Sequence, residues 1–199
     1  MLTARIAVLV SGGGTNLQAL LDAQSRRELK SGSIALAVAD RAGIGAIARA
    51  EKAGIACRTI VRREPGFEEK VLSAFRECGI DMAVLAGFLG ILSADFIRAF
   101  GRPILNIHPA LIPSFCGKGF YGLGVHRAAL DYGVKVTGAT VHLVNEVPDG
   151  GKILLQKAVD VLPGDTPEIL QKRVMEQAEW VILPQAAELV AARIVREKE

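Results

Sequence analysis

The amino-acid sequence predicts an α/β fold in a single domain, with a mostly parallel sheet, an antiparallel edge and helices on both faces. Short apolar runs alternate with segments of helical periodicity over the first half of the chain, and a glycine-rich segment follows the first run. Near residue 133 the pattern changes to an alternation of apolar and polar residues, which predicts the antiparallel edge. Strands that alternate with helices in this way are typical of a parallel sheet covered on both faces.

The elements of the parallel part follow from their periodicity. Short apolar runs rich in β-branched residues predict buried strands, and leucine or alanine at helical spacing predicts helices. Ser93 stands directly before an apolar repeat and is a typical N-cap residue. We therefore expect strands at residues 6–10, 34–39, 57–61, 82–86 and 104–107, and helices at residues 15–28, 43–53, 67–78 and 93–100.

The remainder of the chain contains an extended pair and a long helix. Residues 135–144 and 153–159 flank a turn rich in glycine, which predicts two antiparallel strands at the sheet edge. Further on, Asp165 or Thr166 is expected to cap one long last helix that starts at Pro167.

A glycine-rich stretch lies between the parallel part and the extended pair. Residues 115–124 contain four glycines, and we expect them to form a mobile loop near the functional site. Cys116 lies in this stretch, and nothing in the surrounding sequence indicates a reactive thiolate.

Composition sets limits on what the protein does. The 199 residues are half hydrophobic and carry 24 basic against 21 acidic residues, so one soluble domain over residues 1–199 is expected and its charge does not demand a nucleic-acid partner. The three cysteines and three histidines lack metal-ligand spacing, which predicts no metal site and a reducing compartment. With neither a secretory signal nor an apolar run of membrane-spanning length, the sequence predicts a cytoplasmic protein.

The glycine segment after the first expected strand is a candidate anion site. Ser11, Gly12, Gly13, Gly14, Thr15 and Asn16 lie between a strand and a helix. Free helix N–H groups and a glycine backbone can surround a phosphate there. A tight strand-to-helix turn with Thr15 or Asn16 as the cap explains the same residues, so both interpretations stay open.

A polar strand end is the most informative segment. Asn106 and His108 are two residues apart in an otherwise apolar strand, so they share one face at its carboxyl end. Ligands of open parallel sheets bind beyond this end of the strands. An amide and an imidazole placed there can hold an oxyanion or move a proton, whereas a buried pair bonded to neighbouring loops is the alternative.

Two further residues are weaker candidates. Asp149 lies on a glycine turn, where a carboxylate can face an imidazole, although Asp before Gly is also ordinary turn chemistry. His142 lies on the alternating strand and is expected to be a packed interior histidine that orients other groups at most.

These motifs together resemble the phosphoribosylglycinamide formyltransferase family. The resemblance rests on SGGGTNLQALL, VLAGFLGILS, NIHPALIPSF, VTGATVH and DGG, which occur in the family's order from about residue 5 to residue 189. It implies a Rossmann-like formyltransferase fold and transfer of the formyl group of N10-formyltetrahydrofolate to the amine of glycinamide ribonucleotide in purine biosynthesis. The resemblance also implies two small-molecule substrates, no metal and no nucleic acid or membrane partner.

The resemblance implies a role for each candidate residue. Asn106, His108 and Asp149 are the expected catalytic group, and Thr140 and His142 are expected to orient it. Ser11 and the backbone from Gly12 to Asn16 are expected to bind the substrate phosphate, with Glu179 at the ribose or glycinamide end. The expected folate-binding residues are Leu89, Gly90, Ile91, Leu92, Val144, Asn145, Glu146 and Val147.

The chain departs from the family pattern at several positions. Gly90 stands where an arginine is common, Asn145 where an acidic residue is common and Lys152 where a proline is common, and the loop at residues 64–67 is short. Two other functions therefore remain alternatives: a different formyl-handling enzyme (a formyltetrahydrofolate deformylase or a transferase with another acceptor), or a phosphate-ligand binding module without turnover. An apolar edge strand or the segment at residues 121–132 is a candidate surface for a homodimer.

Overall fold

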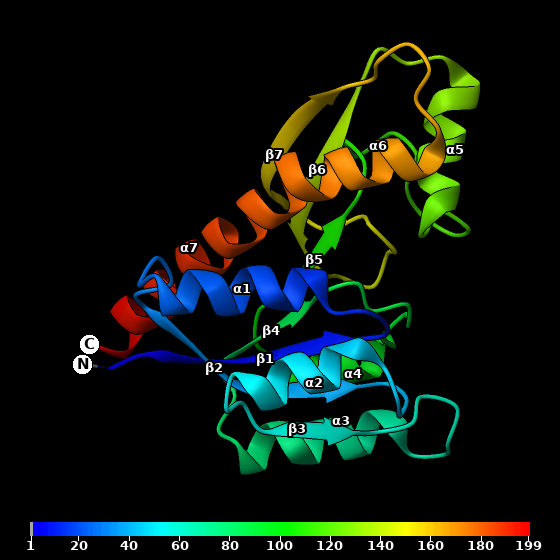
Figure 1. Cartoon of the computed structure of the whole chain (residues 1–199). Coiled ribbons are helices and arrows are strands. Elements are labelled where there is room, and N and C mark those ends of the chain that lie inside the picture. The colour runs from blue at the N-terminus through cyan, green and yellow to red at the C-terminus, as the bar shows by residue number, and fades with distance from the viewer. Residues whose placement is uncertain (1) are drawn as a thin grey trace.

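The computed structural model describes residues 2–199 and contains one seven-stranded sheet in the order β3-β2-β1-β4-β5-β6-β7 (Figure 1). Strands β1 to β5 run parallel, whereas β6 pairs antiparallel with both β5 and β7. The predicted parallel sheet with an antiparallel edge is therefore confirmed. The strands are β1 (Ala4–Val10), β2 (Gly32–Ala39), β3 (Cys57–Thr59), β4 (Met82–Leu85), β5 (Ile104–His108), β6 (Val136–Leu143) and β7 (Ile153–Asp160).

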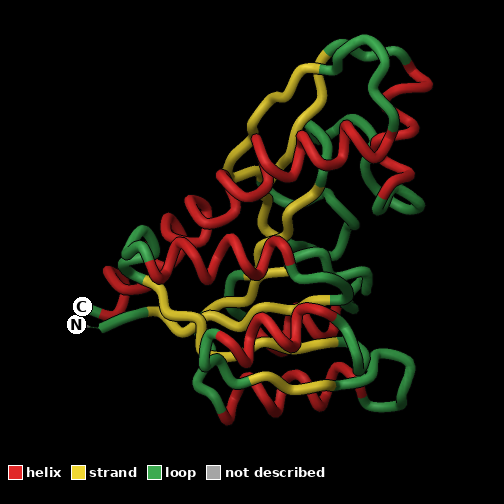
Figure 2. Tube along the Cα trace, in the orientation of Figure 1, coloured by secondary structure: helices red, strands yellow, loops and turns green. Residues whose placement is uncertain are grey.

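Helices cover both faces of the sheet because successive strand residues point to opposite sides (Figure 2). In β1, Ile6 and Val8 pack into a core shared with α1 (Thr15–Ser25), α2 (Gly45–Lys52), α6 (Pro167–Val174) and α7 (Trp180–Lys198). Ala7 and Leu9, which alternate with them, pack into a second core with α3 (Phe67–Glu77) and α4 (Ala94–Phe100). The two cores hold the sheet rigid between them and so fix the ends of its strands.

The parallel strands end at one edge of the sheet, where the candidate residues gather. In register, Leu9 of β1 pairs with Leu85 of β4, and Leu85 pairs with Asn106 of β5. The antiparallel neighbour β6 places His142 opposite Asn106 and Thr140 opposite His108. The glycine segment, the loop after β4 and the polar end of β5 therefore lie side by side.

Two helix ends confirm the predictions and one does not. Ser93 caps α4 by accepting from the Phe96 N–H, and Thr166 caps α6 by accepting from the Ile169 N–H. At the start of α1, neither Thr15 nor Asn16 is the cap that one of the two open interpretations required: the N-cap is Gly14, in the left-handed region (φ 76°), and it makes no side-chain hydrogen bond.

Two helical features were not predicted. Helix α5 (Leu123–Tyr132) includes the last two residues of the expected loop 115–124. It buries Val125, His126 and Ala129 on one side, a pattern too short to be recognised beside the glycines of that segment. The expected single last helix is divided by a π-helical turn, Met175–Glu179, between α6 and α7. Such turns accommodate one extra residue and are frequent at functional sites. Among residues 2–199, no helix is both long and apolar enough to cross a membrane.

Candidate active site

The glycine segment forms an open loop at the N-terminus of α1. Gly14 is required there, because its φ is 76° and an added Cβ would lie 2.7 Å from the Cα and Cβ of Ala46 on α2. Gly12 and Gly13 face open space, with no atom within 4 Å of an added Cβ. The first N–H groups of a helix lack partners within it, and here no side chain caps them. This geometry can accept an anion at the backbone of residues 12–16.

The side chain of Ser11 links three loops and is not free for a ligand. Its Oγ donates to Asp40 Oδ2 (2.8 Å) at the end of β2 and accepts from the Leu89 N–H (2.9 Å) after β4. Asp40 is buried and forms ion pairs with Arg41 and Arg62. Burial alone raises the pKa of the Asp40 carboxyl, but hydrogen bonds from Arg41 and Ser11 and the two arginine charges outweigh it and lower the pKa.

Asn16 and Glu179 form a buried polar pair beside the glycine loop. Asn16 Nδ2 donates to Glu179 Oε2 (2.6 Å), and the Asn16 Oδ1 has no hydrogen-bond partner within residues 2–199. Burial raises the pKa of Glu179, and the hydrogen bond from Asn16 offsets only part of the rise. Two neighbouring acceptor oxygens suit a ligand that donates hydrogen bonds, such as a hydroxyl or an ammonium group.

The three expected catalytic residues come together at the end of β5. Asp149, on the loop between β6 and β7, lies between them: its Oδ1 is 3.4 Å from Asn106 Nδ2, and its Oδ2 is 3.7 Å from His108 Nδ1. Asp149 adopts a positive φ of 55°, which is uncommon outside glycine and typical of tight functional turns. The sequence alone had left this convergence open.

A turn at residues 115–117 closes over the same group. The Phe115 carbonyl accepts a hydrogen bond from His108 Nε2 (2.8 Å), and the Gly117 N–H donates to Asp149 Oδ2 (2.8 Å). Because a carbonyl only accepts, Nε2 of His108 carries a proton, and Nδ1 is the atom that faces Asp149. These two contacts come from backbone groups, so no residue type in the sequence could have pointed to them.

The charge state of Asp149 follows from its neighbours. Burial by itself raises the pKa of this carboxyl, but hydrogen bonds from His142 and the Gly117 N–H, together with the charges of His108 and His142, lower the pKa below its usual value. Asp149 is therefore a carboxylate at neutral pH, placed to stabilise a charged imidazole.

His142 and Thr140 lie on the neighbouring strand β6. His142 Nε2 is 3.2 Å from Asn106 Nδ2 and 3.5 Å from Asp149 Oδ1, while its Nδ1 bonds to the Leu143 carbonyl (2.9 Å). The histidine is thus interior, as predicted, and also touches two of the three expected catalytic residues. Thr140 Oγ1 donates to the Ala110 carbonyl (2.7 Å) and accepts from the Ile112 N–H (3.1 Å), which holds the segment after His108.

The expected folate-binding residues divide into exposed and buried groups. Leu89 and Ile91 are exposed after β4, and Val147 is exposed on the loop that carries Asp149. Leu92 instead belongs to the core beneath, and Val144 packs against that core. Asn145 and Glu146 are exposed polar residues of the same loop, and Glu146 forms an ion pair with Arg98. Exposed apolar side chains on these two loops can hold a flat heterocycle.

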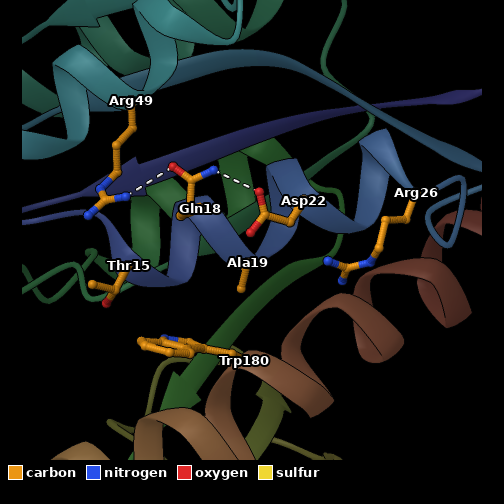
Figure 3. Close-up of a pocket in the computed structure, with 7 residues that line it drawn as sticks. All are labelled: Thr15, Gln18, Ala19, Asp22, Arg26, Arg49 and Trp180. Carbon is orange, nitrogen blue, oxygen red and sulfur yellow. Dashed lines mark hydrogen bonds between the residues drawn. The ribbon is translucent and has the colours of Figure 1, made fainter.

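A cavity of about 280 Å³ lies beside the glycine loop (Figure 3), and its lining includes neither His108 nor Asp149. It runs between α1 and the start of α7 and shares Thr15 with the loop. Arg49 of α2 enters it, with Nε donating to the Gly13 carbonyl (2.8 Å) and Nη1 to Gln18 Oε1 (3.0 Å). A cation therefore lies against the glycine loop.

Comparisons with known proteins identify the family to which the chain belongs. A family model described as formyl transferase matches residues 4–186. The trifunctional purine biosynthetic protein adenosine-3 of Bos taurus is 44% identical over 97% of this chain, and the chain spans about a fifth (19%) of that relative. The phosphoribosylglycinamide formyltransferase of Escherichia coli is 36% identical and is matched over 90% of this chain and 83% of its own length.

Solved structures show the same fold. Glycinamide ribonucleotide transformylase 1 of Symbiobacterium toebii has a TM-score of 0.88 and 38% identity, covering 96% of this chain and 89% of that one. Phosphoribosylglycinamide formyltransferase of Brucella melitensis has a TM-score of 0.85 and 41% identity, covering 96% of both chains. Since the family model matches most of the sequence and these structures match most of the fold, the chain belongs to the formyl transferase family.

Proposed function

We propose that this protein transfers the formyl group of N10-formyltetrahydrofolate to the amine of glycinamide ribonucleotide, as an enzyme of purine biosynthesis. One observation carries the proposal: Asp149 lies within 3.7 Å of polar atoms of both Asn106 and His108, at a sheet end that also carries a glycine loop able to hold a phosphate. The names of the E. coli and S. toebii relatives state formyl transfer to glycinamide ribonucleotide, and the folate donor is what the resemblance of the sequence motifs implies.

The reaction balances without a further reagent. The amine nitrogen attacks the formyl carbon, a carbon–nitrogen bond forms, and negative charge develops on the formyl oxygen. The bond between that carbon and the folate N10 then breaks, its electron pair goes to N10, and N10 receives a proton. The new amide nitrogen loses a proton, so the products are formylglycinamide ribonucleotide and tetrahydrofolate.

The three polar residues divide this work. Asn106 donates an amide N–H to the formyl oxygen, and His108 as an imidazolium stabilises the negative charge that develops there. The negative charge of Asp149 stabilises the imidazolium that takes part in the reaction, and its carboxylate relays the amine proton through water toward N10. His108 Nε2 donates to the Phe115 carbonyl in this structure. The formyl oxygen therefore replaces that carbonyl as the acceptor, and the turn at residues 115–117 moves away.

The binding groups follow the shape of the two substrates. The backbone of residues 12–16 holds the phosphate, and the acceptor oxygens of Asn16 and Glu179 receive hydrogen bonds from the ribose or glycinamide end. The exposed apolar residues Leu89, Ile91 and Val147 contact the pteridine ring of the folate.

A formyl-transfer assay with the purified protein tests the proposal. With glycinamide ribonucleotide and N10-formyltetrahydrofolate, we expect turnover by the wild type and a loss of about 100–1,000-fold in His108→Ala and in Asp149→Asn. Asp131→Asn, which changes an exposed carboxylate of α5, is the matched control and keeps wild-type turnover.

The same assay separates the alternatives. Release of formate without an acceptor indicates a deformylase, and binding of both substrates without any product indicates a module without turnover. Equal activity in the wild type, His108→Ala and Asp149→Asn rejects the catalytic assignment.

A further inference from the structure

The glycine loop is held from one side by helix α2. The Ala46 N–H at the start of α2 donates to the Gly12 carbonyl (3.2 Å). On the same helix, Arg49 Nε donates to the Gly13 carbonyl (2.8 Å). Gly45 allows this close approach, since a Cβ added there would lie 3.2 Å from the Gly13 oxygen. Two successive carbonyl oxygens of the loop therefore point toward α2.

These two carbonyl contacts set the direction of the N–H groups of the loop. In a trans peptide plane the C=O and the N–H point in opposite directions. The Gly13 N–H shares a plane with the Gly12 carbonyl, and the Gly14 N–H shares a plane with the Gly13 carbonyl. Both N–H groups therefore point away from α2, and within residues 2–199 neither of them donates a hydrogen bond. They are the donors that the loop offers to an anion.

Arg49 is itself fixed in its orientation. Its Nη1 donates to Gln18 Oε1 (3.0 Å), and Gln18 Nε2 donates to Asp22 Oδ1 (2.8 Å), as the dashed lines in Figure 3 show. Its stem passes over Gly14, where an added Cβ would lie 3.3 Å from Arg49 Cδ. The N–H groups of a guanidinium form a rigid planar fork, so the bond to Gln18 also determines where Nε points.

Two effects of Arg49 on a bound anion must be distinguished. Both of its hydrogen bonds go to neutral acceptors, so within residues 2–199 they leave its positive charge uncompensated. That charge attracts an anion from any side. Nε, however, contacts the carbonyl side of the loop, whereas an anion binds on the N–H side. From there the guanidinium acts on the anion through the peptide plane that it holds.

We propose that Arg49 is a positioning residue for ribotide binding, which holds the Gly13 carbonyl so that the Gly14 N–H points at the phosphate. This inference rests on the proposed function and assigns to it a residue outside the glycine loop. An N–H that is held toward the anion needs no reorganisation when the anion binds. We expect the loss of one such charge-assisted hydrogen bond to weaken binding about tenfold.

Steady-state kinetics of Arg49→Met form the first part of the test. The methionine keeps an unbranched stem over Gly14 and removes both donors. We expect the KM for glycinamide ribonucleotide to rise about tenfold, while kcat and the KM for the formyl donor change by less than about twofold. Arg26→Met is the matched control, because Arg26 lines the same cavity but pairs with Glu28, and it should keep the wild-type KM.

The backbone amide of Gly14 gives a readout that a charge effect alone does not change. In the ¹⁵N-labelled wild type, saturating inorganic phosphate should move the Gly14 proton resonance downfield, because the N–H then donates to an anion. In Arg49→Met at saturation we expect this shift to fall by about half or more. The shift at Asn16 should stay, because α1 fixes that N–H. A charge effect alone weakens the affinity but leaves both saturated shifts unchanged.

Gln18→Leu repeats the test with the charge of Arg49 kept. The substitution removes the acceptor that orients the guanidinium. We therefore expect a KM for glycinamide ribonucleotide about threefold higher and a smaller Gly14 shift at saturation. Urea denaturation shows whether Arg49→Met is folded, and if it is not, Gln18→Leu decides alone.

Other results overturn the inference. An unchanged KM for glycinamide ribonucleotide in Arg49→Met shows that the arginine does not serve the ribotide site. A raised KM with the full Gly14 shift at saturation in both variants shows that it acts by its charge only. If the wild type shows neither turnover nor a Gly14 response to phosphate, the proposed function fails; if it shows both and the variants match it, only this inference fails.

Discussion

Asn16 and Glu179 are 163 positions apart in the chain, and Asn16 Nδ2 donates a 2.6 Å hydrogen bond to Glu179 Oε2. The bond joins the first turn of α1 to the last residue of the π-helical turn. It fixes a carboxylate beside the glycine loop, in a position where burial disfavours its charge. We expect a ligand that donates hydrogen bonds there to relieve this cost, so that the proposed ribotide binding is coupled to the ionisation of Glu179.

Glu179→Gln is expected to stabilise the protein at neutral and alkaline pH and to weaken ribotide binding. The folded-state pKa of Glu179 is raised, so its stabilising protonated form is fully present below the unfolded value near 4.5 and is lost as the pH rises through the folded value. The glutamine stays neutral and can also donate to the unpartnered Asn16 Oδ1. We expect its free energy of unfolding to exceed that of the wild type by about 1–2 kcal/mol at pH 8.

Urea denaturation between pH 4.5 and pH 8.5 checks this expectation. The difference between variant and wild type should shrink toward the acid end, because Glu179 is then protonated in both the folded and the unfolded chain. A difference that stays constant over this range contradicts the burial argument. In the formyl-transfer assay the same variant should raise the KM for glycinamide ribonucleotide about tenfold or more, since one acceptor charge is lost.

Two neighbouring glycines of the anion loop are expected to respond differently to alanine. Gly14→Ala forces a left-handed residue and places a methyl group 2.7 Å from Ala46, so it should lower the free energy of unfolding by about 2–4 kcal/mol. Gly13→Ala meets no atom within 4 Å and should change the stability by less than about 0.5 kcal/mol. Denaturant titration of both variants checks the prediction, and equal losses contradict it.

Much of the fold could be predicted because its signals are local. The alternation of apolar runs with helical periodicity placed β1 to β5 in order, and the serine and threonine before α4 and α6 marked those helix starts. Asn106 and His108 were recognisable from their two-residue spacing at a strand end. The rest of the site is formed by residues from distant parts of the chain, and local patterns do not show which of them meet. An example is Asp149, which reaches Asn106 from the β6–β7 loop.

What the sequence could not predict depends on backbone geometry or on tertiary contacts. The Phe115 carbonyl and the Gly117 N–H are backbone groups, so the residue type at these positions does not indicate their hydrogen bonds. The glycines that follow them favoured a loop in the sequence, although α5 begins at Leu123. Gly90 indicated only that a side chain was missing, whereas the structure shows the stem of Arg62 lying across it. His142 was expected to be interior, and only the register of β5 with β6 reveals that it faces Asn106.

His142 is expected to position Asn106. In the neutral ring its Nδ1 donates to the Leu143 carbonyl, so its Nε2 accepts from Asn106 Nδ2 and fixes which end of the amide faces the reacting group. His142→Phe removes this acceptor, and we expect kcat to fall about 10–100-fold while both KM values change by less than threefold. His142→Gln, which can supply an acceptor oxygen, should recover part of kcat. A change confined to KM contradicts this role.

The turn at residues 115–117 is expected to open when the formyl group binds. Phe115 accepts from His108 and Gly117 donates to Asp149, and because both contacts belong to one short turn, displacing the first by a formyl oxygen weakens the second. Hydrogen exchange of the Gly117 amide should therefore become faster when the protein is saturated with a folate analogue whose formyl group is attached to carbon instead of N10. The Leu143 N–H, bonded to the Lys152 carbonyl (2.9 Å) away from the turn, is the internal control. Unchanged or slower exchange at Gly117 shows that the formyl oxygen is held without displacing the Phe115 carbonyl, which leaves Asn106 as its donor.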